Sequence, residues 1–405
     1  MRKCKKISAY HFVLGFIISC SNGKNTFSDW AAQISWLNGK PLSKQAVFDR
    51  IHSRTTAFAK QLLEHVLLQL SGNNFDTELF KSFGKVVLHD STTLHLPQAL
   101  SLVFPGSRNQ FGEQKAIARI QSMFDVKAMR FINFSLLSFI QNDQSSSGSV
   151  IQEVSSGDLV IRDLGYFSLA VFEKLIAAKV HILSRLKYGV TITDRSGSPI
   201  SLKSLLKQKA GVDRWVYIGS ERKVWVRLVM TPLPAEKAAE KIRRARHDRD
   251  KRTNHDTAYY NWLRFNFYIT TVPNEVWSAK EVNKAYKVRW QIEIIFKSWK
   301  TGFHLQRILH EGCTNENRVR VAIYLILLFT CLFIQKIYIK YKKTIERRST
   351  TRVSLLKLSC YITRNIKEVL TYNERRLMER IRWHCCYELR HDRVNMTDLY
   401  QKNKN

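Results

Sequence analysis

Five short apolar segments, rich in β-branched and aromatic residues, follow one another in the first half of the chain. They are KVVLHD at 85–90, ARIQSMFDV at 118–126, RFINFSLLSF at 130–139, DLVIRD at 158–163 and VHILSRL at 180–186. Segments of this length and composition predict buried β-strands. A helical pattern, GYFSLAVFEKLIAAK at 165–179, precedes the last of them. Three strands in a meander, followed by a strand, a helix and a strand, predict a mixed α/β sheet.

Composition divides the rest of the chain into regions. At 30–51 an apolar helix, a turn with glycine and Ser43 as an N-cap give a helix–turn–helix pattern. Further on, strand-like segments flank a basic helical run, AEKAAEKIRRARHDRDKR at 235–252, which is a solvated face or a phosphate contact. The expected regions are a helical N-terminal DNA-binding region at 1–75, an α/β core at 76–195 and 276–335, a β-rich insertion at 196–275 and a helical, basic C-terminal region at 336–405.

The chain is strongly basic along its whole length. Its 66 lysines and arginines stand against 33 aspartates and glutamates, which gives a formal net charge of +33. A globular protein with this charge repels itself, so we expect its partner to be a polyanion. Nucleic acid is the first candidate, and a membrane surface is the second.

Seven cysteines are scattered through the sequence without a CxxC pair. An odd number without paired spacing argues against a disulfide framework and indicates a reducing compartment. His384, Cys385 and Cys386 are adjacent and lack the spacing of zinc ligands, so we interpret them as structural. The expected location is therefore the cytoplasm.

Two apolar runs need to be tested as membrane segments. The run FVLGFIISC at 12–20 follows a basic N-terminus and resembles a signal peptide with a lipoprotein-like IISC. The net charge and the cysteine usage favour an amphipathic helix of an N-terminal domain instead. The run VAIYLILLFTCLFI at 321–334 is shorter than the roughly 20 residues that span a bilayer. We expect a buried helix there, and no membrane association.

The segment YKVRWQIEIIFKSWK at 286–300 predicts one helix that carries charges in an apolar sequence. A capping-box pattern at Ser278–Glu281 begins it, and Gly302 would end it. At about 100° per residue, two stripes separate. The polar stripe, within about 60°, consists of Tyr286, Arg289, Glu293 and Lys300; the apolar stripe consists of Val288, Ile292, Ile295 and Trp299. An i, i+4 pair of Arg289 and Glu293 explains only part of the polar stripe.

Two aspartates, Asp90 and Asp163, stand at the ends of predicted strands. Together with Glu293 they can converge on a metal ion. Mg²⁺ prefers a few carboxylates together with waters and phosphate oxygens. Two such ions stabilise the attacking and the leaving oxygen of an in-line displacement at phosphorus. The other residues of the polar stripe would hold a DNA backbone beside them. His89 points to the opposite face by strand alternation, so we exclude it from this site.

The polar stripe reproduces the Y-x2-R-x3-E-x6-K signature of bacterial insertion-sequence transposases of the DDE type. HDSTTLHLP around Asp90 resembles the first-aspartate segment of that family, and DLGYF at 163–167 resembles its second, D-x-G-[YF]. The β-rich insertion is similar to one that some members carry. The resemblance covers residues 80–305 in order and in spacing.

This resemblance implies an RNase H-like catalytic core with a β-rich insertion, flanked by helical regions. It implies Mg²⁺-dependent hydrolysis at the transposon ends through two metal ions, with Mn²⁺ as a substitute, and attack of the freed 3′-hydroxyl on target DNA. The catalytic residues and metal ligands would be Asp90, Asp163 and Glu293. The DNA contacts would be Tyr286, Arg289, Lys300 and Trp290. Trp290 would stack on an unpaired base of a hairpin intermediate or simply pack in the core.

The implied partner is double-stranded DNA, as terminal inverted repeats and as target. Because two ends must be brought together, a homodimer on DNA is expected, in the bacterial cytoplasm at the nucleoid. Two alternatives stay open. One is a catalytically inactive DNA-binding relative or a repressor of transposition, and the other is a lipoprotein attached to the membrane through residues 1–20.

Overall fold

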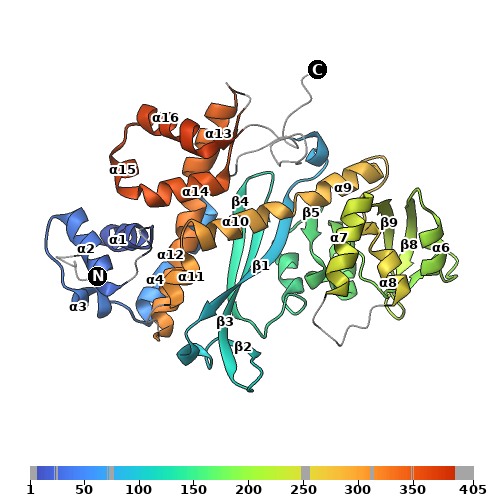
Figure 1. Ribbon diagram of the computed structural model, residues 1–405, viewed down its shortest axis with the longest axis horizontal. Helices are drawn as coiled ribbons and strands as arrows, with labels where there is room; N and C mark the ends of the chain where they lie inside the picture. Colours follow the sequence, from blue (N-terminus) through green and yellow to red (C-terminus); the bar gives the residue numbers. More distant parts are fainter. Residues whose placement is uncertain are drawn as a thin grey trace.

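The computed structural model describes residues 7–21, 23, 26–70, 72, 77–247, 256–310, 314–347, 349 and 351–387. Figure 1 shows an elongated molecule with a β-sheet at its centre. The N-terminal and C-terminal helices gather at one end of the sheet. The strands at residues 192–232 and 265–270 form the other end.

One mixed sheet of ten strands organises the described residues. Its spatial order is β2–β3–β1–β5–β6–β10–β9–β8–β7, and β4 also pairs with β3. The strands are β1 Val86–Leu96, β2 Pro105–Arg108, β3 Gln114–Asp125, β4 Arg130–Ser138, β5 Leu159–Arg162, β6 His181–Arg185, β7 Ile192–Thr193, β8 Val212–Ile218, β9 Val224–Pro232 and β10 Phe265–Thr270. A separate two-stranded sheet pairs β11 Arg352–Val353 with β12 Cys386–Tyr387.

The first strands reproduce the predicted core. β1, β3 and β4 form the antiparallel meander, and β5 and β6 then run parallel to β1. Helix α5, Leu169–Ala177, connects β5 to β6. The resulting order β4–β3–β1–β5–β6 is that of an RNase H-like core, and the predicted fold class is confirmed.

Strands β7–β10 extend this same sheet. β10 lies between β6 and β9 and is antiparallel to both, because Tyr268 pairs with Arg185 on one side and with Val229 on the other. The strands of the predicted β-rich insertion therefore share backbone hydrogen bonds with the core. The basic run predicted as a helix forms α7, Ala235–Arg246. Its last residues, 248–252, lie outside the described residues.

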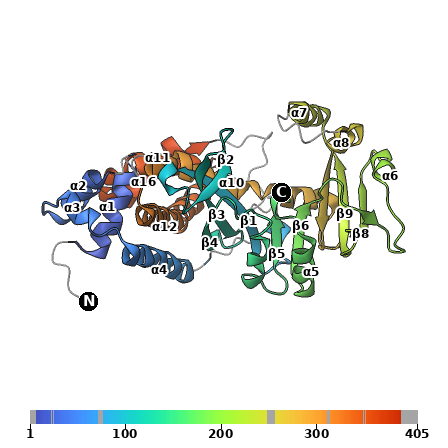
Figure 2. The same cartoon turned by 90° about the horizontal axis from the view of Figure 1, so that it is seen from below.

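Different helices cover the two faces of the sheet (Figure 2). On one face, Phe172 and Leu175 of α5 belong to the same apolar cluster as Val87 of β1. On the other, Leu88 belongs to the cluster that contains Ile292 of α10. Because side chains alternate along a strand, successive residues of β1 point to opposite faces. Position 90 therefore points to the face that carries α10.

Helices occupy most of the described residues outside the sheet. Those on the N-terminal side are α1 Ala9–Ser21, α2 Phe27–Asn38, α3 Lys44–Phe48 and α4 Ser53–Gln69. Those between or after the strands are α6 Leu202–Lys207, α8 Thr257–Trp262, α9 Ala279–Lys287, α10 Trp290–Thr301, α11 Leu305–His310, α12 Glu316–Leu332, α13 Ile339–Glu346, α14 Leu355–Arg364, α15 Ile366–Thr371 and α16 Glu374–Cys385. Short turns are the 3₁₀ segments Glu78–Phe80, Gln98–Leu100, Ser147–Gln152 and Leu164–Tyr166, and the π-helical segment Phe333–Tyr338.

The predicted helix–turn–helix pattern is present at the N-terminal end. Helix α2 ends at Gly39, whose φ of 68° is left-handed, a conformation that glycine adopts at no steric cost. Ser43 then begins α3, because its side chain accepts a hydrogen bond from the backbone N–H of Ala46. Helix α3 has five residues.

Both apolar runs form helices packed inside the protein. In α1, Phe16 and Ile18 are buried in one cluster with Trp30 and Ile34 of α2. The run at 321–334 lies in α12 and the π-helical turn after it. Of the described residues, Glu316–Glu346 is the one helix long and apolar enough to cross a membrane, and most of its apolar part is buried. The buried helix predicted at 321–334 is confirmed, and the run at 12–20 forms a helix as predicted, although it is buried on more sides than the amphipathic helix that we expected.

Two local predictions are wrong. β1 does not end at Asp90 but continues to Leu96, because its second half pairs with β3, where Leu96 lies opposite Ala116. The segment 286–300 is two helices, not one: α9 ends at Lys287, and α10 begins after a turn at residues 288–289. The capping box at the start of α9 and the end of α10 at Gly302 are confirmed.

Candidate active site

Two neighbouring strands bring two aspartates together. β1 and β5 run parallel, and His89 pairs with Arg162. Asp90 and Asp163 follow these paired residues, so they are neighbours across the sheet. Asp163 is the first residue after β5 and lies at its carboxyl end. The carboxyl ends of parallel strands are where ligands bind in open α/β sheets.

The turn between α9 and α10 places Arg289 beside these aspartates. The backbone N–H of Arg289 donates to the carbonyl of Tyr286 at 3.1 Å, and that of Gln291 donates to the carbonyl of Val288 at 3.0 Å. Hydrogen bonds three residues apart belong to the 3₁₀ form, which has 3.0 residues per turn. The backbone stays right-handed, with φ −52° and ψ −35° at Arg289. The turn therefore joins α9 to α10 while the backbone stays in the right-handed helical region.

The guanidinium of Arg289 contacts three carboxylates. Nη1 lies 3.0 Å from Asp90 Oδ2, Nη2 lies 2.7 Å from Glu293 Oε1, and Nε lies 3.8 Å from Asp163 Oδ1. The Arg289 side chain is 6% exposed, and the contact with Asp90, which is 14% exposed, is largely shielded from water. Asp163 and Glu293 are 40% and 35% exposed, so water reaches their side of the contact. The contacts with Asp90 and Glu293 have the length of charge-assisted hydrogen bonds, which are among the strongest in proteins. Nε, at 3.8 Å from Asp163, makes an ion pair without a hydrogen bond. The structure thus gathers the three predicted carboxylates around one cation.

An open hollow of about 350 Å³ lies over this group. Its lining residues are Asp90, Ser91, Thr92, Asp163, Arg289, Glu293, Phe296, Lys297 and Lys300. Lys297 and Lys300 are exposed and stand one turn apart on α10. The hollow therefore combines carboxylates with two lysines that solvent, or a ligand from solvent, can reach.

Burial sets the protonation of the site. Burial raises the pKa of Asp90 to about 6, although the charge of Arg289 and the backbone N–H of Ser91 oppose this shift. Burial also raises the pKa of the Tyr286 hydroxyl, and the charge of Asp163 adds to it. Neighbouring groups of the hollow partly desolvate the ammonium of Lys300 and lower its pKa, although the residue is exposed overall. Tyr286 is therefore a neutral hydrogen-bond donor at physiological pH.

The predicted DNA contacts occupy different positions. Tyr286 is buried, and its hydroxyl donates to Asp163 Oδ1 at 3.0 Å, so its contact here is with a carboxylate. Trp290 is 53% exposed, and the Arg289 guanidinium lies 5.3 Å from its ring centre. Trp290 is therefore not packed in the core. Contacts of these residues with DNA stay predictions.

A second carboxylate network was missed from the sequence. Asp143 Oδ1 accepts hydrogen bonds from Ser91 Oγ at 2.7 Å and from Arg119 Nη1 at 2.7 Å. Gln121 Nε2 donates to the same oxygen at 3.0 Å. A Cβ at Gly165 would lie 3.1 Å from Asp143 Oδ2, which is closer than most real contacts. The glycine of the D-x-G motif therefore makes room for Asp143. No local pattern in the sequence signals this network, because Arg119 and Ser91 lie 24 and 52 residues from Asp143.

The opposite face of the same strands carries buried polar side chains. His89 is fully buried, and its ring centre lies 4.3 Å from that of Tyr166, which confirms that it points away from Asp90. Arg162, which pairs with His89 across the two strands, is also buried, and its guanidinium lies 5.8 Å from the centre of the Tyr166 ring. Burial lowers the pKa of His89 and lowers that of Arg162 to about 9, so the imidazole is neutral.

A second hollow, of about 410 Å³, begins at Leu164, the residue after Asp163. It is lined by residues of or next to β6, α7, α8 and β10. Its basic and aromatic lining consists of Arg185, Lys241, Arg244, Tyr188, Tyr259, Trp262, Phe265 and Phe267. Burial and then the charge of Arg185 lower the pKa of Lys241 to about 8. The hollow offers positive charge and ring faces close to the carboxylates.

The donor atoms suit a hard divalent cation, although they do not form a closed cage. Within the described ranges, no three His, Cys, Asp or Glu side chains converge as a metal cluster. The carboxylates of Asp90, Asp163 and Glu293 instead share Arg289. Mg²⁺ is commonly held by one or two carboxylates together with waters and phosphate oxygens, so it needs no such cage.

The sheet order and the position of these carboxylates define an α/β protein of the RNase H-like class. Residues 81–333, more than half of the chain, match the family model described as a transposase DDE domain. The chain therefore belongs to the DDE transposase family.

Its relatives are transposases of insertion sequences. The chain is 26% identical over 320 residues to the transposase for insertion sequence element IS231F of Bacillus thuringiensis subsp. israelensis, covering 73% of this chain and 66% of that protein. It is 25% identical over 304 residues to the transposase for IS1151 of Clostridium perfringens, covering 69% and 64%. It is 24% identical over 359 residues to that of IS231B of Bacillus thuringiensis subsp. berliner, covering 82% and 74%. The chain spans slightly less than two thirds of the first two relatives.

Proposed function

We propose that the chain cleaves DNA at the ends of an insertion sequence and joins the freed ends to target DNA. The observation that supports this most strongly is the group of Asp90, Asp163 and Glu293 around Arg289, in an open hollow at the carboxyl end of β5. Membership of the DDE transposase family and the names of the relatives agree with it.

The three carboxylates would hold the divalent metal ions that this chemistry uses, Mg²⁺ with Mn²⁺ as a substitute. Bound there, the metal ions would activate the attacking oxygen and stabilise the leaving oxygen at phosphorus. Asp163 and Glu293 are partly exposed and would be the first ligands that an ion meets. Tyr286 orients Asp163 through its hydrogen bond, and Ser91 orients Asp90 through its backbone N–H.

The surface around the carboxylates supports contact with DNA. Lys297 and Lys300 line the hollow and would pair with backbone phosphates. Arg185, Lys241 and Arg244 would do the same in the second hollow. Trp290 is half exposed beside Arg289, which leaves its ring available to stack on an unpaired base.

The partners follow from the reaction. Terminal repeats and target are both double-stranded DNA, and two ends must meet before strand transfer. We therefore include a homodimer assembled on DNA, acting in the cytoplasm, in the proposal.

The test uses the full-length protein and DNA carrying the sequences that flank its gene, with and without Mg²⁺. Glu293→Gln is expected to lower end-specific nicking by at least about 100-fold, because it removes a negative ligand, while end binding stays within about two-fold. Glu316→Gln is the matched control. Like Glu293, Glu316 lies in the first turn of a helix, pairs with an arginine four residues away and is partly exposed.

Three results would contradict the proposal. Nicking that is equally strong in Asp90→Ala would place the chemistry elsewhere. Binding to the ends without Mg²⁺-dependent nicking in the wild type would favour a DNA-binding relative or repressor. Loss of fold in Glu293→Gln, with Glu316→Gln unaffected, would make the carboxylate group a structural ion pair.

A further inference from the structure

The C-terminal helices α14, α15 and α16 carry a basic surface that the catalytic proposal does not use. Exposed cations gather on α16, whose described sequence from Glu374 to Cys385 is ERRLMERIRWHC. The buried residues of this helix, Leu377, Ile381 and Cys385, repeat every four positions and face the core. The arginines occupy the remaining positions and face solvent. Helix packing therefore sorts the charges onto one exposed face.

Two open hollows flank Arg380 on this surface. One, of about 540 Å³, lies between the three helices, and the other, of about 480 Å³, lies along α16. The first is lined on its polar and aromatic side by Lys357, Arg364, Arg380, Tyr361, Tyr372 and His384. The second is lined by Asn373, Arg375, Arg376, Glu379, Arg380 and Trp383. Each hollow contains a single glutamate, so positive charge dominates both.

Among the residues that the structure describes, carboxylates balance only part of the charge of this surface. Arg375 lies 3.4 Å from Glu379, and Glu374 lies 2.9 Å from Lys340. In the part of the chain that the structure describes, Arg376, Arg380 and Arg382 make no ion pair with a carboxylate. Arg376 and Arg380 are four residues apart, and like charges at this spacing destabilise a helix by a few tenths of a kcal/mol. An external polyanion would offset this repulsion.

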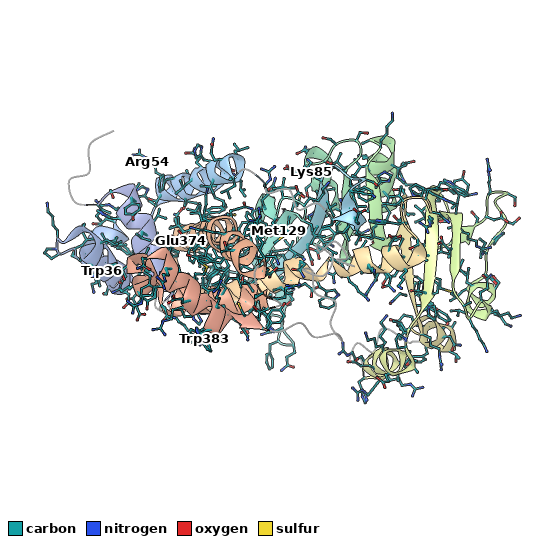
Figure 3. The ribbon with its side chains drawn as sticks, turned by 90° about the horizontal axis from the view of Figure 1, so that it is seen from above. Trp36, Arg54, Lys85, Met129, Glu374 and Trp383 are labelled. Atoms are coloured by element: carbon teal, nitrogen blue, oxygen red, sulfur yellow. The ribbon has the colours of Figure 1, made fainter. Side chains whose placement is uncertain are left out.

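An aromatic side chain stands among these charges. Trp383 is 85% exposed, which is unusual for so large an apolar group. At the same end of the molecule, Lys367 Nζ lies 4.8 Å from the ring centre of Trp36. Figure 3 shows Trp36 and Trp383 at the surface of the end formed by the N-terminal and C-terminal helices. Basic groups interleaved with exposed rings are typical of nucleic-acid surfaces.

We propose that this surface, formed by α14–α16 and centred on Arg380, binds the phosphate backbone of duplex DNA without reading its sequence. Arg376 and Arg380 lie about 6 Å apart along the helix axis, at 1.5 Å per residue. Two phosphate steps of one strand span about 7 Å of duplex axis. With the helix parallel to the duplex, the two guanidinium groups therefore match phosphates that are two steps apart on one strand. Arginine also suits phosphate because its planar fork can donate two hydrogen bonds at once.

The surface belongs to the same body as the active site. Helix α14 packs on α10, the helix that carries Glu293, and the two lie side by side in Figure 1. A Cβ at Gly302, at the end of α10, would meet Ser359 Oγ of α14 at 2.8 Å. DNA held on the C-terminal helices would therefore be held by the same body that carries the catalytic carboxylates. The inference rests on the proposed action on DNA.

The test measures binding of the full-length protein to a labelled duplex of about 30 base pairs, unrelated in sequence to the DNA around its gene. Binding is followed by fluorescence anisotropy in EDTA at several salt concentrations. The variant Arg376→Gln/Arg380→Gln/Arg382→Gln is compared with Lys203→Gln/Lys207→Gln/Lys209→Gln. The control removes the same charge from exposed positions on and after α6, at the opposite end of the molecule (Figure 1).

Each phosphate contact contributes about 0.9 to the slope of log affinity against log salt concentration. We expect the arginine variant to lower that slope by about 2 to 3, and the lysine control to change it by less than 1. Trp383→Ala removes no charge and should leave the slope unchanged. Circular dichroism establishes that each variant is folded.

The outcomes separate this inference from the proposed function. If the wild type does not bind duplex DNA, both fail. If the wild type binds and the arginine variant keeps its slope, only the surface is misassigned. A changed oligomeric state by sedimentation, with the slope intact, would identify a second copy of the chain as the occupant. An equal loss of slope in both triple variants would mean that net charge alone is responsible.

Discussion

Replacing Arg289 by glutamine removes the cation that joins the three carboxylates. Removing one partner of a buried ion pair costs about 3 to 5 kcal/mol, because the other charge is left uncompensated. Only the contact with Asp90 is buried on both sides, with side chains 6% and 14% exposed. Asp163 and Glu293 are 40% and 35% exposed, and water screens such contacts to about 0 to 1 kcal/mol each. We expect Arg289→Gln to lower the free energy of unfolding by about 3 kcal/mol at pH 8.

The free energy of unfolding lost in Arg289→Gln should be smaller at low pH. Burial raises the pKa of Asp90 to about 6 in the folded protein, against an ordinary value of about 3.9. The protonated carboxyl therefore favours the folded state fully below about pH 4, and this contribution is lost as the pH rises through about 6. At pH 5 most wild-type Asp90 is neutral and its pairing with Arg289 contributes little. At pH 5, Arg289→Gln should therefore lower the free energy of unfolding by only about 1 kcal/mol.

The measurement is urea unfolding followed by circular dichroism at pH 5 and pH 8. Arg222→Gln is the control, because Arg222 pairs with Glu173 where both side chains are about half exposed. That variant should lose less than about 1 kcal/mol at either pH. The reasoning is refuted if Arg289→Gln costs no more than Arg222→Gln at pH 8. It is also refuted if the loss at pH 5 equals or exceeds that at pH 8.

Three further predictions concern packing around the site. Gly165→Ala should lower the denaturation midpoint, because its new Cβ would meet Asp143. Gly148→Ala should not, because a Cβ there meets open space. In a double-mutant cycle, Gly165→Ala should cost less stability when Asp143 is already replaced by alanine. Gly302→Ala should cost about 1 to 3 kcal/mol, since the new Cβ would lie 2.8 Å from Ser359 Oγ and 2.9 Å from the carbonyl of Ser298; a midpoint equal to that of Gly148→Ala would contradict this. Trp299→Ala should cost about 3 to 5 kcal/mol in urea unfolding, and Trp290→Ala less than about 1, because Trp299 is fully buried and Trp290 is not.

The sequence predicted the core well because its strands are short apolar segments. β3 and β5 are buried along almost their whole length, and β4 is partly buried. The run DLVIRD became β5, and the two strands around the turn at 127–129 became β3 and β4. Apolar segments of this kind carry a signal that does not depend on their partners. Position alone was enough to identify Asp163 as a residue that follows a strand.

Features that depend on tertiary pairing were harder to predict. Polar residues beyond Asp90 hide the second half of β1, which becomes a strand because β3 is long enough to pair with it. The turn at Arg289 breaks no local rule, since the residues on both sides favour a helix. The turn brings Arg289 to Asp90 and Asp163, and these contacts depend on tertiary packing that the local sequence does not show. Asp143 could not be found because its partners lie 24 and 52 residues away in the chain.

The site is assembled from segments that are far apart in the chain, which sets an order in time. Asp163 and Glu293 are separated by 130 positions (293 − 163). At about 5 to 20 residues per second, a ribosome needs roughly 7 to 26 seconds to add them. Throughout that interval β1 and β5 can pair, but Arg289 and Glu293 do not yet exist. A nascent chain therefore carries Asp90 and Asp163 side by side without their counter-charge. Arg289, which neutralises their repulsion, is added only just before helix α10.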